Sequence, residues 1–358
     1  MGLYEFLFFF GFIVVIGAIL LLDLGVFEKD DKEVTFKRAA IMTASWVTLA
    51  LAFFFFIRYQ GHWIHGITDM ASLQEVAQRY HSTLQIQELS YQEALTQYQH
   101  KMSLEYITGY LIEYSLSIDN IFVMILIFTS FAVPSRYYKR VLMWGVLGAI
   151  IMRFIFIFSA GVLIQKYAWV LYVFGAFLIY SGIKMYLQRN KPQEMNPSNH
   201  HLVKFLSKHF NISSTIEGHN FVRRINGKRY ITPLLLCLIV IEFTDVIFAV
   251  DSIPAIFGVT QDPYVVFFSN IFAILGLRSL FFVISKVMHM FRYLKIGLSV
   301  LLCFIGVKML AEHWLETIGF ETIHSLFAIV AIIAISILFS IIIPEKKSIT
   351  DSSQPSKS

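Results

Sequence analysis

Long apolar blocks alternate with short polar segments along the chain. Nine blocks have the length and composition of membrane helices, at 6–24, 39–57, 104–128, 141–165, 168–187, 234–256, 264–285, 293–310 and 323–343. About 20 apolar residues in helical form span the roughly 30 Å hydrocarbon core of a bilayer. Because a helix satisfies its own backbone polar groups in lipid, the pattern predicts an all-α polytopic membrane protein with about nine transmembrane helices.

Basic residues are concentrated in alternate loops between these blocks. Loop 28–38 holds four Lys and Arg residues, whereas 258–263 and 311–322 hold none. Short cytoplasmic loops of membrane proteins are enriched in Lys and Arg. With nine spans, the alternation predicts an N-terminus outside the cell and a C-terminus in the cytoplasm.

Three segments lie outside the membrane in this arrangement: 70–103 as an external helical loop, 188–230 as a cytoplasmic loop, and 345–358 as a disordered cytoplasmic tail. The cytoplasmic loop contains an amphipathic helix at 201–210 and an Asn-Gly hairpin signal at 226–227. We therefore expect 1–344 to form a single transmembrane domain with these appended elements.

The composition also indicates a membrane protein. The chain is 57% hydrophobic and 15% charged, against about 25% charged in ordinary soluble domains. The net charge of +5 reflects loop topology, so we expect a lipid bilayer and no nucleic acid as partner. Cys237 and Cys303 both lie in apolar blocks, which indicates neither a disulfide framework nor a Cys zinc motif.

The third to fifth blocks align with the sixth to eighth. Four pairs of ionisable residues match in the same order: Glu113 with Asp245, Asp119 with Asp251, Arg153 with Arg278, and Lys184 with Lys308. Each unit has three spans, so the second unit enters the membrane from the opposite side. Inverted repeats of this kind are typical of secondary transporters that bind their substrate at the midplane. The two lysines are expected to extend to lipid headgroups at opposite surfaces.

Ionisable residues within membrane helices are expensive and usually functional. The predicted metal-binding residues are Glu113, Asp119, Asn120, Asp245 and Asp251, whose hard oxygen ligands suit Mn²⁺, Mg²⁺ or Ca²⁺. The four carboxylates with Arg153 and Arg278 leave a net charge that matches one divalent cation. Without metal, such a cluster holds protons, because like charges raise one another's pKa. The cluster therefore predicts exchange of a metal ion for protons.

Helix geometry leaves two arrangements open for these carboxylates. Residues six apart on a regular helix are turned by about 120°, so Glu113 and Asp119 point in different directions, as do Asp245 and Asp251. Either the helices unwind here, an arrangement that Pro254 favours in the sixth span, or different walls of the pathway use different carboxylates.

Further polar residues in the spans balance charge or carry protons in this scheme. They are Glu242, Arg153, Arg278, Asn270 and Asp23. Arg153 and Arg278 are expected to form ion pairs with the acids. The amide of Asn270 either joins two helices or contributes to the site, and Asp23 lies at the inner end of the first span.

Several segments resemble the TerC family of integral membrane proteins and its Alx-like members. They include GYLIEYSLSIDNIFV at 109–123, EFTDVIFAVDSIPAIFGVTQDP at 242–263 and SNIFAILGLRSLFFVI at 269–284. The resemblance implies a bacterial cytoplasmic (inner) membrane protein of metal-ion homeostasis, associated with manganese export in Alx-like members and with tellurite resistance. The family's motifs fall on the predicted metal-binding residues and on Asn270 and Arg278.

The leading functional hypothesis is therefore a secondary transporter that exports divalent metal ions, Mn²⁺ first, from the cytoplasm in exchange for protons. We expect no enzymatic activity and no cofactor, because Mn²⁺ would be the transported ion and not a resident group. The alternative is a non-transporting scaffold or accessory protein for metal or tellurite stress and for metalation of secreted enzymes. The sequence leaves open a homo-oligomer or another membrane partner.

Overall fold

The structure, a computed structural model, describes residues 3–23, 35–81, 84–189, 201–213, 220–225, 228–287 and 293–342. This part of the chain is almost entirely helical, which confirms the all-α class. Its elements are α1 (Leu3–Asp23), α2 (Phe36–Gln60), α3 (His62–His65), α4 (Met70–Tyr80), α5 (Tyr91–Ser130), η1 (Ser135–Tyr137), α6 (Tyr138–Lys166), α7 (Trp169–Gln188), α8 (His201–His209), β1 (Val222–Ile225), β2 (Lys228–Ile231), α9 (Pro233–Phe257), α10 (Pro263–Leu275), α11 (Leu277–Val287), α12 (Leu294–Leu310), α13 (Glu312–Thr317) and α14 (Thr322–Ile342).

Each of the nine apolar blocks is helical in the structure. Six helices are long and apolar enough to cross a membrane: α2, α5, α6 with η1, α7, α9 and α14. The pair α10 and α11 is bent by 51° and counts as a seventh span if it crosses as one unit. In α1 only Tyr4–Leu20 counts as an apolar helix, and α12 has 17 residues, so the nine-span count stays a prediction.

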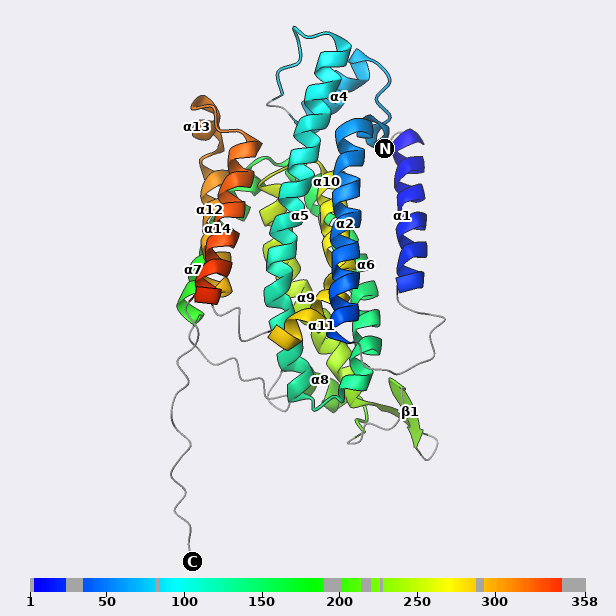
Figure 1. Ribbon diagram of the computed structural model, residues 1–358. Coiled ribbons are helices and arrows are strands. Elements are labelled where there is room, and N and C mark those ends of the chain that lie inside the picture. The colour runs from blue at the N-terminus through cyan, green and yellow to red at the C-terminus, as the bar shows by residue number, and fades with distance from the viewer. Residues whose placement is uncertain are drawn as a thin grey trace, which may run out of the picture.

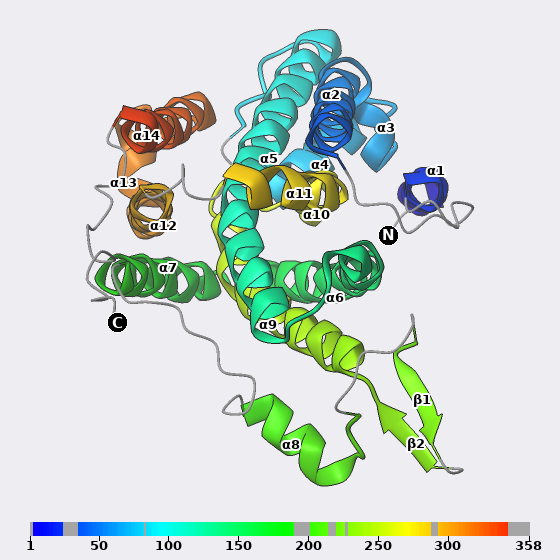
Figure 2. The same ribbon diagram turned by 60° about the horizontal axis from the view of Figure 1, so that its bottom comes forward.

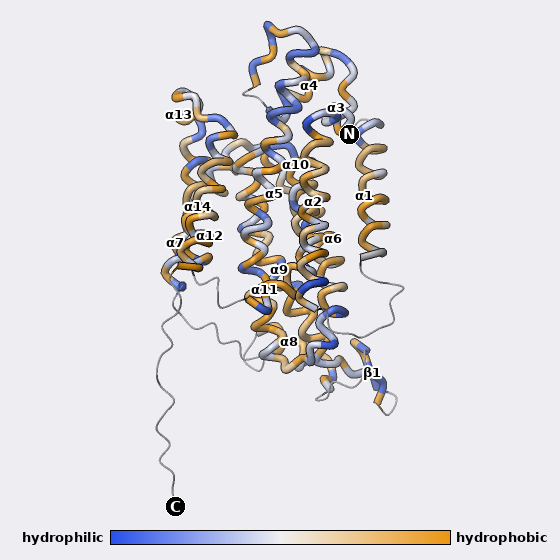
Figure 3. Tube along the Cα trace, in the orientation of Figure 1, coloured by the Kyte–Doolittle hydropathy of each residue, from blue (hydrophilic) through white to orange (hydrophobic). Residues whose placement is uncertain are grey.

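The long helices run roughly side by side and leave polar elements at both ends (Figure 1). One end carries α3, α4 and α13, and we call it the α4 end; the other carries α8 and the β1–β2 hairpin, and we call it the α8 end. Figure 3 shows hydrophobic residues along the bundle and hydrophilic residues concentrated at these ends. The view in Figure 2 places α5 and α9 between a group of α7, α12 and α14 and a group of α1, α2, α6, α10 and α11.

The segment 70–103, predicted as an external helical loop, contains one whole helix and the start of another. Helix α4 ends at Tyr80, and α5 begins at Tyr91 and continues for 40 residues to Ser130. A capping box starts α5: the Ser90 side chain accepts from the Glu93 backbone N–H, and the Glu93 side chain accepts from the Ser90 backbone N–H. The third span is therefore the inner part of a helix that projects beyond the bundle.

The segment at the α8 end matches its prediction in both elements. Helix α8 covers His201–His209, and β1 pairs with β2 in antiparallel register from Val222↔Ile231 to Ile225↔Lys228. The Asn-Gly turn at 226–227, the tail at 345–358 and the side chain of Asp23 lie outside the described residues.

The contact between α7 and α12 has a twofold character. A Cβ added to Gly182 on α7 would meet Ser299 O at 2.7 Å and Cys303 Sγ at 2.6 Å on α12. A Cβ added to Gly306 on α12 would meet Gly175 O at 2.6 Å and the Ile179 side chain at 2.8 Å on α7. The alignment that pairs Lys184 with Lys308 also pairs Gly182 with Gly306, Gly175 with Ser299 and Ile179 with Cys303. These matched contacts favour the inverted repeat, which across all six spans stays a prediction.

Candidate functional site

A buried arginine joins the two central helices near the middle of the bundle. Arg153 on α6 forms ion pairs with Glu113 on α5 through Nη1 and with Asp245 on α9 through Nη2, the second at 3.3 Å. Arg153 Nη1 also donates to Asn270 Oδ1 on α10 at 2.8 Å, and Asn270 Nδ2 donates to Glu113 Oε2 at 3.1 Å. The side chains of Arg153 and Glu113 are at most 1% exposed. We call these four residues the Arg153 cluster.

The cluster brings together a repeat-related pair that the sequence alignment singled out. Glu113 and Asp245 occupy matched positions and bind the same guanidinium, as expected for intramembrane acids that need a cationic partner. Close packing around the cluster depends on Gly109 of α5, because a Cβ there would lie 2.9 Å from Ile256 Cγ2 and from Ser269 Oγ. Asn270 hydrogen-bonds to both Arg153 and Glu113, and it thereby joins α10 to α5 and α6.

A small cavity adjoins the cluster. Its polar lining is Glu242 and Asp245 of α9 and Arg278 of α11, and its apolar lining comes from α5, α6, α9 and α11. The α6 residues that line it lie near the start of α6, which begins at the α8 end. The cavity therefore lies on the α8-end side of Arg153.

Glu242 reaches the cavity because α6 presents a glycine to it. A Cβ on Gly148 would overlap the Glu242 carboxylate. Glu242 and Asp245 are three residues apart on one helix, so they lie on the same face. Two carboxylates thus point toward one small space, with the guanidinium of Arg278 beside them.

Asp251 lies apart from the Arg153 cluster and contacts α7. Its Oδ1 accepts a hydrogen bond of 2.8 Å from Ser181 Oγ, and it interacts electrostatically with Lys184. Asp119, its repeat counterpart, interacts electrostatically with Lys295 of α12. Asp251 of the second predicted repeat therefore contacts a helix of the first, and Asp119 of the first lies within electrostatic range of a lysine on a helix of the second.

Some buried polar atoms in these two segments have no hydrogen-bond partner. Among the described residues, they include Asp119 Oδ1 and one atom each of the residues that follow the two aspartates in sequence, Asn120 Nδ2 and Ser252 Oγ. Unsatisfied buried polar groups cost about 1–3 kcal/mol each. A further polar species at any of these atoms would therefore be stabilised.

The unwound arrangement, one of the two left open above, is not seen. Helices α5 and α9 are continuous through their acidic residues, and α9 also continues through Pro254. The break lies instead at Gly276, between α10 and α11. Glu113 and Asp245 face Arg153, whereas Asp119 and Asp251 face α12 and α7. Within the described residues, no three His, Cys, Asp or Glu side chains form a ready-made metal group.

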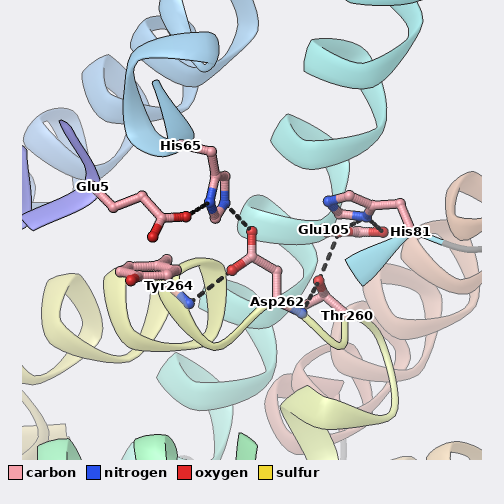
Figure 4. A network of polar contacts seen from close by, with 7 residues as sticks. All are labelled: Glu5, His65, His81, Glu105, Thr260, Asp262 and Tyr264. Carbon is pink, nitrogen blue, oxygen red and sulfur yellow. Dashed lines mark hydrogen bonds and ion pairs between the residues drawn. The ribbon is translucent and has the colours of Figure 1, made fainter. Parts of the chain in front are cut away.

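A second polar network, which the sequence pattern does not predict, lies at the α4 end (Figure 4). His65 of α3 contacts Glu5 Oε1 of α1 through Nδ1 at 3.0 Å and Asp262 Oδ2 through Nε2 at 2.8 Å. His81 Nδ1 contacts Glu105 Oε1 at 3.3 Å, and Thr260 Oγ1 donates to Glu105 Oε2 at 2.7 Å. The residues come one at a time from distant segments, and only the Asp-Pro step at 262–263, a helix-start signal, marked any of them.

The α9–α10 loop is also held from α12. Lys308 Nζ donates to Gly258 O at 3.0 Å. Its ammonium therefore binds the end of α9, and the expectation that it extends to lipid headgroups is wrong.

Comparisons with known proteins agree with the fold. Residues 98–348 match the family described as "Integral membrane protein TerC family". The "Uncharacterized membrane protein STKORF319" of Myxococcus xanthus is 42% identical over 299 residues, which cover 84% of this chain and 82% of that protein. No solved structure matches the chain.

Two further relatives have similar coverage. The "Putative membrane-bound redox modulator Alx" of Escherichia coli (strain K12) is 40% identical over 306 residues, 84% of each chain. The "Uncharacterized membrane protein" of Rickettsia felis is 36% identical over 331 residues, 92% of this chain and 96% of that protein.

Proposed function

This chain belongs to the TerC family of integral membrane proteins, and we propose that it exports divalent metal ions, Mn²⁺ first, in exchange for protons. One observation carries the proposal: carboxylates from two repeat-related helices share one buried arginine beside a cavity that two carboxylates line. Charged side chains inside a membrane are costly, so membrane proteins retain them mainly where they have a function such as ion passage.

The charges around the cavity suit a competition between a dication and protons. Glu113, Asp245 and Glu242 supply three carboxylates, against the guanidinium groups of Arg153 and Arg278. Carboxylate oxygens at cavity positions are hard ligands for Mn²⁺. The three carboxylates and two guanidinium groups carry a net charge of −1, which a bound dication raises to +1. When the metal leaves, protonation of two carboxylates gives the same local charge. The exchange of one cation for protons follows from this balance.

The proposed direction of transport rests on the predicted topology. The positive-inside pattern of the sequence predicts that the α8 end lies in the cytoplasm and the α4 end outside. The cavity adjoins the Arg153 cluster on the α8-end side, so a cytoplasmic ion reaches Glu242 and Asp245 first. Asp119 and Asp251 then form a second wall of the pathway, toward α12 and α7.

Flux into proteoliposomes that contain only the purified protein tests the proposal. We expect Mn²⁺ movement that depends on a pH gradient, that competing divalent ions reduce, and that Asp245→Asn lowers at least tenfold. Glu88→Gln is the matched control, because Glu88 is an exposed acid outside the spans. Absence of metal flux with the wild-type chain under every gradient would favour a scaffold or the redox role in the Alx relatives' name.

A further inference from the structure

The loop between α9 and α10, residues 258–262, is fixed from three sides. Lys308 of α12 binds Gly258 O, Glu105 of α5 accepts from Thr260, and His65 of α3 binds Asp262. The side chains of Thr260 and Asp262 are buried. Asp262 also caps α10, because its Oδ1 accepts from the Tyr264 backbone N–H at 2.9 Å.

The loop in the matching place of the first repeat has a different environment. It connects α5 to α6 at the α8 end, and its side chains at Ala132, Pro134, Ser135 and Arg136 are exposed. The α5–α6 loop buries Val133, whereas the α9–α10 loop buries Val259, Thr260 and Asp262. Of two loops that correspond in the predicted repeat, one is therefore mostly buried and the other mostly exposed. In an inverted repeat, such a difference distinguishes the closed side of the pathway from the open side.

Two helices connect the buried loop to the Arg153 cluster. On α5, Glu105 lies eight residues before Glu113; on α10, Asp262 lies eight residues before Asn270. Eight helical residues extend about 12 Å. Asn270 donates to Glu113, so the two helices are joined at both levels. Displacement of the loop therefore moves a residue that contacts Glu113.

We propose that residues 258–262 form the gate at the α4 end of the pathway, and that His65, held between Glu5 and Asp262, is its latch. The gate must release α10 from α1 and α3 for an ion to leave at this end. The inference deepens the proposed export function and rests on it for the direction of transport. The latch itself is a conformational property that can be measured without transport.

The charges around His65 define how the latch responds to pH. The imidazole faces Glu5 of α1, Asp262 of the loop, and the rings of Tyr80 on α4 and Tyr264 on α10. Arg79 forms a side-chain hydrogen bond with Tyr80 and interacts electrostatically with Glu5, and His81 interacts electrostatically with Asp262. Burial alone lowers the pKa of His65, but its two carboxylate partners outweigh burial and raise it to about 9. The protonated latch is therefore present at neutral pH and is lost as pH rises through about 9.

Hydrogen–deuterium exchange of the full chain in lipid nanodiscs tests the latch. We expect His65→Gln to accelerate amide exchange across 258–266 at least tenfold at pH 7, while exchange in α7 is unchanged. The control is His100→Gln, which replaces an exposed histidine at the same end. Unchanged exchange in a folded His65→Gln protein would overturn the proposal.

A second variant covers the possibility that His65→Gln does not fold. Thr260→Val keeps the side-chain volume but removes the hydroxyl that donates to Glu105. Thr260→Ser retains that hydroxyl. We expect faster exchange at 258–266 in the valine variant and wild-type exchange in the serine variant. Equal exchange in both would contradict a gate fixed by Glu105.

The pH dependence and the flux separate the latch from the transport proposal. Corrected for intrinsic exchange rates, wild-type exchange at 258–266 should rise between pH 8 and about 10, and His65→Gln should remove that rise. Absence of the rise in the wild type would overturn the latch. If the wild type shows the rise but no Mn²⁺ flux, the latch stands and the export function fails.

Discussion

Glu113 and Asp245 hold matched positions in the two predicted repeats and bind opposite terminal nitrogens of one buried guanidinium, that of Arg153. The pair thereby links α5, α6 and α9 at the centre of the bundle. Breaking a buried ion pair leaves an uncompensated charge and typically costs about 3–5 kcal/mol. The first prediction follows from this cost.

Arg153→Met should lower the thermal unfolding temperature of the protein in detergent, because it leaves two carboxylates without their partner. We expect the free energy of unfolding to fall by about 3–5 kcal/mol. The triple change Arg153→Met, Glu113→Gln, Asp245→Asn should recover more than half of that loss, since it removes the unpaired charges. A triple variant as unstable as the single one would mean that Arg153 acts through packing alone.

Gly148→Ala should disable transport through Glu242. The added methyl group would overlap the Glu242 carboxylate, so the acid must leave its position beside the cavity. Overpacking of this kind costs about 1–3 kcal/mol, and we expect Mn²⁺ flux to fall at least fivefold. Gly11→Ala in α1 is the control, because nothing lies within 4 Å of its added Cβ. Equal flux in the two variants would exclude Glu242 from the pathway.

Asp251→Asn should impair transport without destabilising the fold. The residue contacts Ser181 and lies apart from the Arg153 cluster, so we expect the free energy of unfolding to stay within about 0.5 kcal/mol of wild type. Flux should nevertheless fall at least tenfold, and cells should accumulate Mn²⁺. Asp119→Asn should behave alike. Normal export by both variants would remove Asp119 and Asp251 from the site.

Stability should depend on His65 at alkaline pH. A pKa of about 9 in the folded protein, against 6.5 as the ordinary value, corresponds to a stabilisation on the order of 3 kcal/mol at neutral pH. This stabilisation is complete below pH 6.5 and disappears as pH rises through about 9. Unfolding temperatures measured from pH 6 to pH 10 should therefore fall more steeply for wild type than for His65→Gln. Parallel curves would show that His65 is neutral when folded.

Much of the fold could be predicted from the sequence, because each membrane helix carries its own signal. Apolar length located the long helices, and the predicted repeat paired Glu113 with Asp245, which bind one arginine. The start of α5 was missed because hydropathy does not register a water-exposed extension, although Ser90 and Glu93 form a capping signal. Helix-end chemistry would have placed that boundary.

The remaining parts of the site depend on information that the sequence does not carry locally. Whether Asp251 faces α6 or α7 depends on the rotation of α9 against its neighbours, which hydrophobicity in lipid does not fix. The latch joins Glu5, His65 and Asp262, which are 60 and 197 residues apart along the chain. Single polar residues at such separations form no pattern until the helices pack.

Gly182 and Gly306 allow α7 and α12 to pack closely at two places, each nearer one of the two membrane faces. Gly182 meets α12 toward the start of that helix, whereas Gly306 meets α7 nearer the other surface. A larger side chain at one glycine would push the two helices apart at one membrane face, and at the other glycine it would do so at the opposite face. Valine at each position in turn should thus favour opposite-facing conformers of a single protein, which gives structural work a means to capture both.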